Sequence, residues 1–414
     1  MQWSNSISTR PSLEAAVKEV VEKSLESLEN RADLGLVFIS SAFASEYPRL
    51  MPLLKEHLPE TIIIGCGGGG IIGMNQDGKP QELEQEPAIS LSLAHLPEVT
   101  VKPFHISAEQ LPDLDSSPDD WCNLIGVPTA DNPQFIILAD PFSAKINDLL
   151  QGLDYAYPSS AKVGGLASGG LSGKNAGLFC QERLYEEGVV GVSLSGQIVL
   201  ETIVAQGCRP IGKPYRVTEG ERNIVLELEE LVNAEQVVSG GIKQSPLEAL
   251  QDLVQNLNEK DRKLAENSLF VGIVRNEFKQ DLEQGDFLIR NLIGVDPKVG
   301  AIAIGDRVRA GQRIQFHLRD AHTSAEDLEM LLERYHREVS IEKKSTNSAA
   351  ALMFSCLGRG EGLYGQPNFD SRLFSRYLNI PISGFFCNGE IGPVAGSTFL
   401  HGYTSVFGIF HQPS

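Results

Sequence analysis

Short apolar runs that end in glycine or small polar residues recur along the chain, and each predicts a strand. Residues 35–39 form one such run, which ends at Ser40, and residues 61–64 form a second, which leads into the glycine-rich segment 65–70. A helical pattern lies between them, and a third run at 89–93 alternates apolar and polar positions. The order is therefore strand, helix, strand, glycine loop and strand.

The same order recurs twice downstream, starting at residues 135–138 and again at 351–354. A strand, helix and strand in succession form a right-handed parallel crossover. We therefore expect the strands that start at Leu36, Phe135 and Ala351 each to run parallel to the second strand of its copy. The third strand of each copy can pair antiparallel to them.

These repeats define the predicted fold class, which is α/β in the broad sense (α+β). We expect mixed β-sheets with helices on their outer faces, built from reused β-α-β-glycine loop-β units, in two domains. Ser12 predicts the cap of a helix within residues 1–33. The first domain then covers residues 34–240 and the second covers 241–414, because Ser245-Pro246 after a glycine pair predicts a new helix.

The acidic composition limits the partners that the protein is expected to have. Its 414 residues carry a formal net charge of −19 and have a pI of about 4.9. Such a chain repels phosphate backbones and anionic lipids, so we expect neither a nucleic-acid nor a membrane partner. The first residues lack the basic region and apolar core of a signal peptide. An anionic ligand would need a basic side chain beside it.

The cysteines indicate a reducing compartment. All six stand far apart without CxxC spacing, at residues 66, 122, 180, 208, 356 and 387. This spacing predicts free thiols and a cytoplasmic location, and it argues against structural zinc. Segment 65–70 matches GxGxxG, but the residues after it do not readily begin the helix that a dinucleotide site requires. We therefore expect no cofactor and no metal.

Reactive side chains are most concentrated between residues 380 and 404, where they stand beside glycines that leave the backbone accessible. The side chains are Cys387, Asn388, Glu390 and His401, and the glycines beside them are Gly384 and Gly389. They predict either a ligand pocket or active site, or a tight turn whose polar side chains cap backbone groups. The residue types alone leave both interpretations open.

Two combinations of residues in and near this region predict specific chemistry. Arg359 follows the first strand of the third copy and Glu390 follows the second, at the strand ends where parallel sheets bind ligands. They could bind a ligand together, or form an ion pair that joins two loops. Cys387, His401 and Glu390 are also the residue types of a thiol nucleophile, its base and an orienting carboxylate.

Several segments together resemble one protein family. Phe-Phe-Cys-Asn-Gly-Glu-Ile-Gly-Pro, followed by Leu-His-Gly-Tyr-Thr, resembles the end of the C-terminal part of the FIST domain. Further segments resemble the same family's C-terminal strands at 286–296 and 311–320, and its N-terminal part at 61–73 and 207–227. The resemblance covers most of the chain.

The resemblance implies a cytoplasmic sensory protein in signal transduction that binds a small molecule, an amino acid or a related metabolite. It implies a small-molecule ligand and a protein signalling partner, and favours a non-enzymatic role. The ligand carboxylate would meet Arg359 or Arg290, and its ammonium would meet Glu390. The full set of expected ligand-binding residues is Arg359, Gly384, Cys387, Asn388, Gly389, Glu390, His401 and Arg290.

Two alternatives belong to other functional classes. The first is an enzyme that uses the thiol or carboxylate of the Cys387–Glu390 loop. The second is an adaptor whose acidic surface recruits another protein, as the F-box members of the family suggest. Turnover of a bound compound would indicate the enzyme, and co-purification with one partner would indicate the adaptor. The sequence does not predict the oligomeric state.

Overall fold

The chain divides into two compact units. The computed structural model describes residues 1–142, 144–170, 177–231, 241–342 and 349–413. The first unit combines Met1–Ala205 with Glu329–Ser414, and the second is Gln206–Leu328. The second unit is thus inserted into the sequence of the first. The sequence predicted two domains that follow each other along the chain, divided between residues 240 and 241. The contacts instead group the two ends of the chain in one unit. Residue 240 lies outside the described residues.

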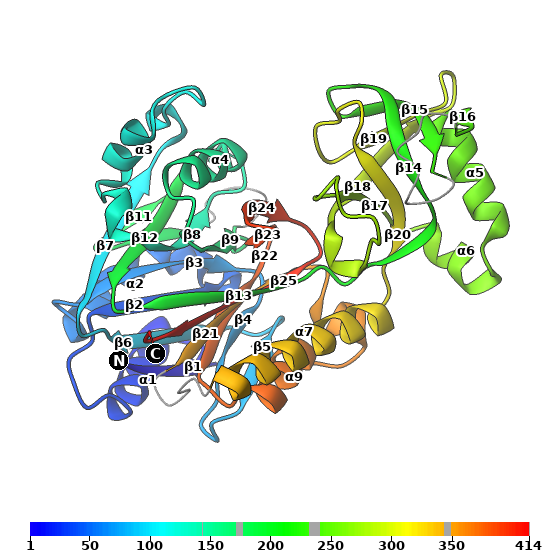
Figure 1. The fold of residues 1–414 in the computed structure, drawn as a ribbon. Coiled ribbons are helices and arrows are strands. Elements are labelled where there is room, and N and C mark those ends of the chain that lie inside the picture. The colour runs from blue at the N-terminus through cyan, green and yellow to red at the C-terminus, as the bar shows by residue number, and fades with distance from the viewer. Residues whose placement is uncertain (143, 171–176, 232–240, 343–348, 414) are drawn as a thin grey trace. The chain divides into compact units, whose positions relative to one another are not determined.

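The described residues of the first unit form three sheets of six strands each (Figure 1). The first sheet has the order β1 (Gln2–Ser8), β6 (Ile89–His95), β2 (Leu34–Ser40), β3 (Ile62–Gly68), β10 (Leu178–Cys180) and β11 (Arg183–Tyr185). The second has the order β7 (Val99–Ile106), β12 (Val189–Gly196), β8 (Gln134–Ala139), β9 (Lys162–Leu166), β23 (Glu390–Val394) and β24 (Ser397–His401). The third has the order β13 (Val199–Ala205), β25 (Ser405–His411), β21 (Ala350–Cys356), β22 (Ile382–Cys387), β4 (Ile71–Met74) and β5 (Pro80–Leu83).

All three sheets follow one plan, which confirms the predicted repeat. Strand β2 runs parallel to β3, β8 to β9, and β21 to β22. Each first strand also pairs antiparallel with the last strand of its own repeat, which is β6, β12 or β25. On the far side of that last strand lies the strand that precedes the repeat, β1, β7 or β13. Strand β1 was not predicted, because residues 1–33 were expected to form only a helix.

The hairpin of each repeat pairs with the sheet of another repeat. Strand β4 of the first repeat pairs with β22 of the third, β10 of the second pairs with β3 of the first, and β23 of the third pairs with β9 of the second. The exchange is cyclic, so each sheet is completed by a neighbour. The sequence did not predict this exchange, because the apolar pattern of a strand does not specify which strand it pairs with.

One glycine in each second strand makes these parallel pairs possible. Gly65, Gly164 and Gly384 each stand opposite a residue near the middle of the first strand of their repeat. A methyl group on any of them would overlap the carbonyl oxygen of that residue. The overlapping residues are Val37, Ile137 and Met353. Any side chain larger than hydrogen is therefore excluded unless the backbone moves.

Apolar side chains from all three sheets meet in one core. Buried residues such as Phe38, Leu138 and Phe354 belong to this cluster, one from each first strand. Because side chains alternate across a strand, the opposite faces are free to pack against helices. The sheets therefore surround a common interior.

Helices cover the outer faces, as predicted. The helices of the first unit are α1 (Leu13–Glu26), α2 (Tyr47–His57), α3 (Pro118–Ile125), α4 (Ile146–Ala156), α8 (Gly360–Tyr364) and α9 (Phe369–Tyr377). Helices α1 and α2 pack on the first sheet, and α3 and α4 on the second (Figure 1). Helix α9 packs on the third, where Phe374 stacks on Phe407 at 5.0 Å. Ser12 caps α1 as expected, accepting from the N–H of Ala15.

The second unit is a closed antiparallel barrel. Its strands follow the order β14 (Arg209–Glu221), β20 (Arg313–Leu318), β17 (Leu269–Val274), β18 (Phe287–Asp296), β19 (Ala301–Ile304), β15 (Ile224–Glu230) and β16 (Lys243–Gln244). Pairing of β14 with β15 closes the barrel. Helices α5 (Pro246–Asn256) and α6 (Glu259–Ala265) lie along one side (Figure 1).

The remaining elements connect these structures. Helix α7 (Ala321–Glu342) begins in the second unit and continues into the first. The short 3-10 helices are η1 (Ser41–Glu46), η2 (Ala108–Gln110), η3 (Thr129–Asp131) and η4 (Gln284–Asp286). All six cysteines are free thiols, as their spacing predicted. Among the described residues, every helix is too short or too polar to cross a membrane.

Replacing Gly164 by Ala should strongly destabilise the first unit, because the new methyl group meets the carbonyl oxygen of Ile137 and cannot rotate away. We expect the free energy of unfolding to fall by about 3 kcal/mol or more in urea denaturation. Gly402→Ala is the control, since no heavy atom lies within 4 Å of its new methyl group. Equal stability of the two variants would contradict the role of Gly164.

Acidification should destabilise the second unit through His317. Burial lowers the pKa of this imidazole to about 4, although its Nδ1–H donates to the Gln315 carbonyl. Between pH 6.5 and 4 the unfolded chain therefore binds a proton that the folded chain does not, so stability is lost as the pH falls. The loss should be about 3 kcal/mol relative to His317→Gln, measured by denaturation across this range. A constant difference between the two proteins would exclude this contribution.

Candidate functional site

The glycine-rich turns of the three repeats meet at one junction in the first unit. The Ser168 hydroxyl donates to the Phe386 carbonyl and accepts from the N–H of Gly69 at 2.8 Å. The N–H of Phe386 donates to the Gly70 carbonyl at 2.9 Å. The carboxyl ends of β3, β9 and β22 are thereby held together. This is the end of parallel strands at which ligands commonly bind.

Asn388 joins the second and third repeats at this junction. Its backbone N–H donates to the Leu166 carbonyl at 3.1 Å, and its side-chain amide donates to the Ala167 carbonyl at 3.2 Å. The N–H of Leu166 donates back to the Gly389 carbonyl at 2.8 Å. Asn388 is exposed, whereas Gly384, Cys387 and Gly389 are buried. Of these neighbours, only Asn388 presents a side chain to solvent.

Cys387 is placed as a structural thiol. Its side chain is fully buried and fits against Gly165, where a methyl group would overlap its sulfur. Burial, and after it the charge of Glu390, raises the pKa of this thiol well above its usual value. The nucleophilic form of cysteine is the thiolate. The geometry therefore opposes the thiol-enzyme hypothesis.

Glu390 and His401 stand directly opposite each other on β23 and β24. Glu390 is fully buried, and its Oε2 accepts from the N–H of Thr404 at 3.0 Å. His401 is 4% exposed, and its Nε2–H donates to the Gly392 carbonyl at 2.9 Å. These contacts favour the interpretation in which polar side chains of the loop satisfy backbone groups.

Both predicted arginines hold carboxylates of the protein itself. The guanidinium of Arg359 donates to Asp370 at 2.7 and 3.1 Å and to the Tyr364 hydroxyl at 2.5 Å. The sequence left open whether Arg359 binds a ligand or forms an ion pair, and in the structure it forms an ion pair with Asp370. Arg290 belongs to the second unit, where its Nε donates to Asp306 at 2.8 Å. Arg290 therefore belongs to another unit than the predicted residues of the third repeat.

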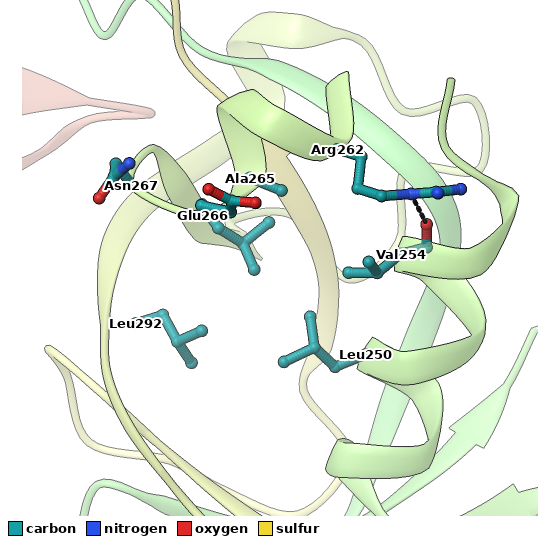
Figure 2. A pocket seen from close by; sticks show the side chains of 8 residues that line it. Leu250, Val254, Arg262, Ala265, Glu266, Asn267 and Leu292 are labelled. Atoms are coloured by element: carbon teal, nitrogen blue, oxygen red, sulfur yellow. Dashed lines mark hydrogen bonds between the residues drawn. The ribbon is translucent and has the colours of Figure 1, made fainter. Parts of the chain in front are cut away.

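The second unit contains a pocket of about 470 Å³ (Figure 2). It lies between α5, α6 and the strands β17 and β18, and most of its lining is aliphatic. The lining residues are Leu250, Val254, Arg262, Ala265, Glu266, Asn267, Leu269 and Leu292. Figure 2 shows Leu250 and Leu292 across from each other and the polar side chains spread over the other end, with Asn267 at one edge, Glu266 in the middle and Arg262 at the opposite edge. An apolar pocket with a few polar groups is the usual form of a small-molecule site.

A cation, an anion and an amide stand at the polar end of this pocket. Arg262 is oriented by the end of α5, because its Nε donates to the Val254 carbonyl at 3.2 Å and its Nη2 to the Leu257 carbonyl at 3.2 Å. Within the described part of the chain, its Nη1 has no protein partner. Glu266 and Asn267 follow directly after α6 and are exposed. The three side chains can donate to a carboxylate, pair with an ammonium and bond a neutral group.

No motif in the sequence points to this pocket. The reactive side chains that stand out in the sequence lie at strand ends of the third repeat. The pocket residues instead come from two helices and two strands spread over residues 250–292, and each looks ordinary alone. The signal in the sequence was Arg262 in a short helical segment, followed four residues later by Glu266 and then by Asn267. In the described part of the chain, His, Cys, Asp and Glu side chains form no group of three that could hold a metal.

Comparison with known families agrees with the resemblance seen in the sequence. The FIST N domain matches residues 33–230, and the FIST C domain matches residues 246–393. The chain belongs to the FIST family. FIST domains are associated with sensing and signal transduction. The predicted sensory class is therefore supported at the level of the family.

Relatives extend over the whole chain. An uncharacterized protein of Mycobacterium tuberculosis is 32% identical over 406 residues, which is 98% of this chain and 98% of the relative. An uncharacterized protein of Mycobacterium bovis is 31% identical and covers 98% of this chain and 97% of its own length. An F-box/LRR-repeat protein of Arabidopsis thaliana is 27% identical over 34% of this chain and 30% of its own.

Among solved structures, a cyanuric acid hydrolase from A. caulinodans covers 100% of this chain and 99% of its own. Its TM-score is 0.31 and its sequence identity is 8%, and a similarity at this level supports no conclusion about activity.

Replacing Ser168 by Ala should loosen the junction of the three glycine-rich turns. The change removes the hydroxyl that links the N–H of Gly69 to the Phe386 carbonyl, so both groups lose a partner. We expect the free energy of unfolding to fall by about 1–3 kcal/mol. The exposed Ser159→Ala is the matched control, and urea denaturation measures both variants. No difference between them would show that the turns are held by other contacts.

Proposed function

We propose that this FIST protein is a small-ligand-binding sensory protein of the cytoplasm, and that the pocket of the second unit holds the ligand. The ligand is a small amphipathic molecule with a carboxylate and an ammonium group, such as an amino acid or a related metabolite. The observation that carries the proposal is the pocket itself, with its aliphatic walls and one polar end.

The size and charge of the pocket support this ligand class. Its volume of about 470 Å³ lies within the roughly 300–1,000 Å³ of small-molecule sites. In a chain with a net charge of −19, an anionic ligand needs a local cation, and Arg262 supplies one. Glu266 would pair with the ammonium, and Leu250 and Leu292 would contact the apolar part. The N–H groups of Arg262 Nη1 can donate hydrogen bonds to the carboxylate of the ligand.

The cellular setting is part of the same proposal. Six free thiols support a reducing compartment, and the acidic composition supports neither a lipid surface nor a nucleic acid as the partner. A sensory protein must pass its signal on, so we propose that the liganded form is recognised by a protein partner. The residues predicted in the third repeat, from Arg359 to His401, remain a second candidate site, with Asn388 as its exposed member.

Ligand binding is tested by thermal-shift screening of the purified protein against the common amino acids and their deaminated and decarboxylated analogues. We expect stabilisation by an apolar amino acid, because an excess of about 100-fold over Kd adds about 2.7 kcal/mol. Leu292→Trp, which fills the pocket, should abolish that stabilisation. Glu266→Gln should weaken binding by about 1.5–3 kcal/mol, as measured by calorimetry, because it removes the charge and keeps the apolar contacts of the pocket.

The controls separate the two candidate sites. Glu259→Gln removes a carboxylate at the other end of α6, outside the pocket lining, and should leave binding unchanged. Glu390→Gln removes the charge of the buried loop and should also leave it unchanged if the pocket is the site. Binding that survives Leu292→Trp but is weakened by Glu390→Gln would place the ligand in the third repeat. Turnover of the bound compound would indicate an enzyme.

A further inference from the structure

The hairpin of the first repeat is fastened to helix α9 of the third repeat by one carboxyl group. Glu82 lies on β5 and is 4% exposed. Its Oε1 accepts from the N–H of Ser371 in the first turn of α9 at 2.7 Å. Its own backbone N–H donates to Asn368 Oδ1 at 2.5 Å. Glu82 therefore caps a helix that lies more than 280 residues away in the sequence.

The surroundings of Glu82 already contain a complete ion pair. Asp370 is 1% exposed and precedes Ser371, and it is bound by the guanidinium of Arg359 through two hydrogen bonds. Within the described residues, Oε2 of Glu82 has no hydrogen-bond partner. The charge of Asp370 acts on Glu82, and both carboxyl groups are buried. Ionised Glu82 would leave one negative charge without compensation there.

We propose that Glu82 is a proton-dependent clasp, which holds the β4–β5 hairpin on α9 when it carries a proton and weakens that contact when it is ionised. A protonated carboxyl still accepts from the N–H of Ser371 through one oxygen, and its own O–H leaves no buried charge. An ionised one keeps the hydrogen bond but must bear desolvation and repulsion by Asp370. The inference concerns the first unit and does not depend on the proposed ligand.

The electrostatics agree with this assignment. Burial, and after it the charge of Asp370, raises the pKa of Glu82 to about 7, while the hydrogen bond from Ser371 acts in the opposite direction. In an opened hairpin the carboxyl returns to its usual value of 4.5. The folded contact therefore binds more protons than the opened one, so it is strongest at low pH and is lost as the pH rises through neutrality.

The other charged groups nearby do not replace this control. Glu84 on the same hairpin is half-buried and accepts from the N–H of Glu361 at 2.8 Å, and its charge adds to the repulsion. Strand β4 carries no titratable side chain. On α9 the further charged side chains are Arg372 and Arg376, and both are exposed. The buried cluster consequently depends on Glu82, Asp370 and Arg359.

Opening of the clasp would reach the junction of the glycine-rich turns. Strand β4 pairs with β22 at Gly384 and Phe385, and the carbonyl of Gly70 accepts from the N–H of Phe386. A loosened hairpin would therefore weaken the edge of the third sheet beside the turns. This links the state of one proton to the shape of the surface around Asn388.

Hydrogen exchange of the full-length protein tests the clasp. We compare amide protection in residues 71–83 between wild type and Glu82→Gln, from about pH 5.5 to 8.5. Glutamine mimics the protonated carboxyl, and comparison at each pH removes the intrinsic pH dependence of exchange. The protection of wild type relative to the variant should fall roughly 30-fold over this range. Glu86→Gln, an exposed position beside the hairpin, should behave as wild type.

The same fall in protection in Glu82→Gln as in wild type would overturn the proposal, because the pH effect would then arise elsewhere. If the variant does not fold, carbon-13 NMR of the Glu82 carboxyl in wild type gives the answer directly. A titration midpoint near neutrality supports the clasp. A midpoint near 4.5, the usual value for glutamate, overturns it.

Discussion

The close approach of paired backbones at Gly65, Gly164 and Gly384 is the constraint on which the first unit depends. At each glycine the carbonyl oxygen of the neighbouring first strand occupies the space of a side chain. The same second strand then accepts the hairpin of another repeat on its free edge. Each parallel pair thus becomes the centre of a six-stranded sheet. Because the hairpins are exchanged cyclically, each repeat completes its sheet with the hairpin of one other repeat and gives its own hairpin to the remaining one.

This exchange explains why the polar residues of the third repeat are buried. Glu390 and His401 lie on a hairpin whose first strand pairs with β9 of the second repeat, so strand pairing with another repeat covers this hairpin while their hydrogen bonds stay within the third. Glu390 accepts from a backbone N–H and Cys387 fills the space left by Gly165. A concentration of reactive side chains can therefore serve the docking of strands. Asn388 is the member of the group that remains at the surface.

The second unit has a different construction and carries the candidate ligand pocket. It is inserted between β13 and β21 of the third repeat, where the first repeat has α1 and the second has α3. A barrel that closes through β14 and β15 shares its core with α5, whose Ala249 and Leu253 belong to the same buried cluster. The pocket forms where α5 and α6 meet the strands β17 and β18. The sensory association of the FIST family and this pocket together motivate the proposed function.

The sequence by itself determined the local elements and their order. Apolar runs ending in glycines located the parallel pairs, and Ser12 and Ser245 located two helix starts, because these signals act between neighbouring residues. The FIST resemblance was also readable from contiguous segments. Tertiary structure alone decided which hairpin completes which sheet, that Arg359 pairs with Asp370, and that Arg262 and Glu266 share a pocket with Leu292. Those outcomes depend on contacts between distant segments, and a residue type does not specify its partner across such distances.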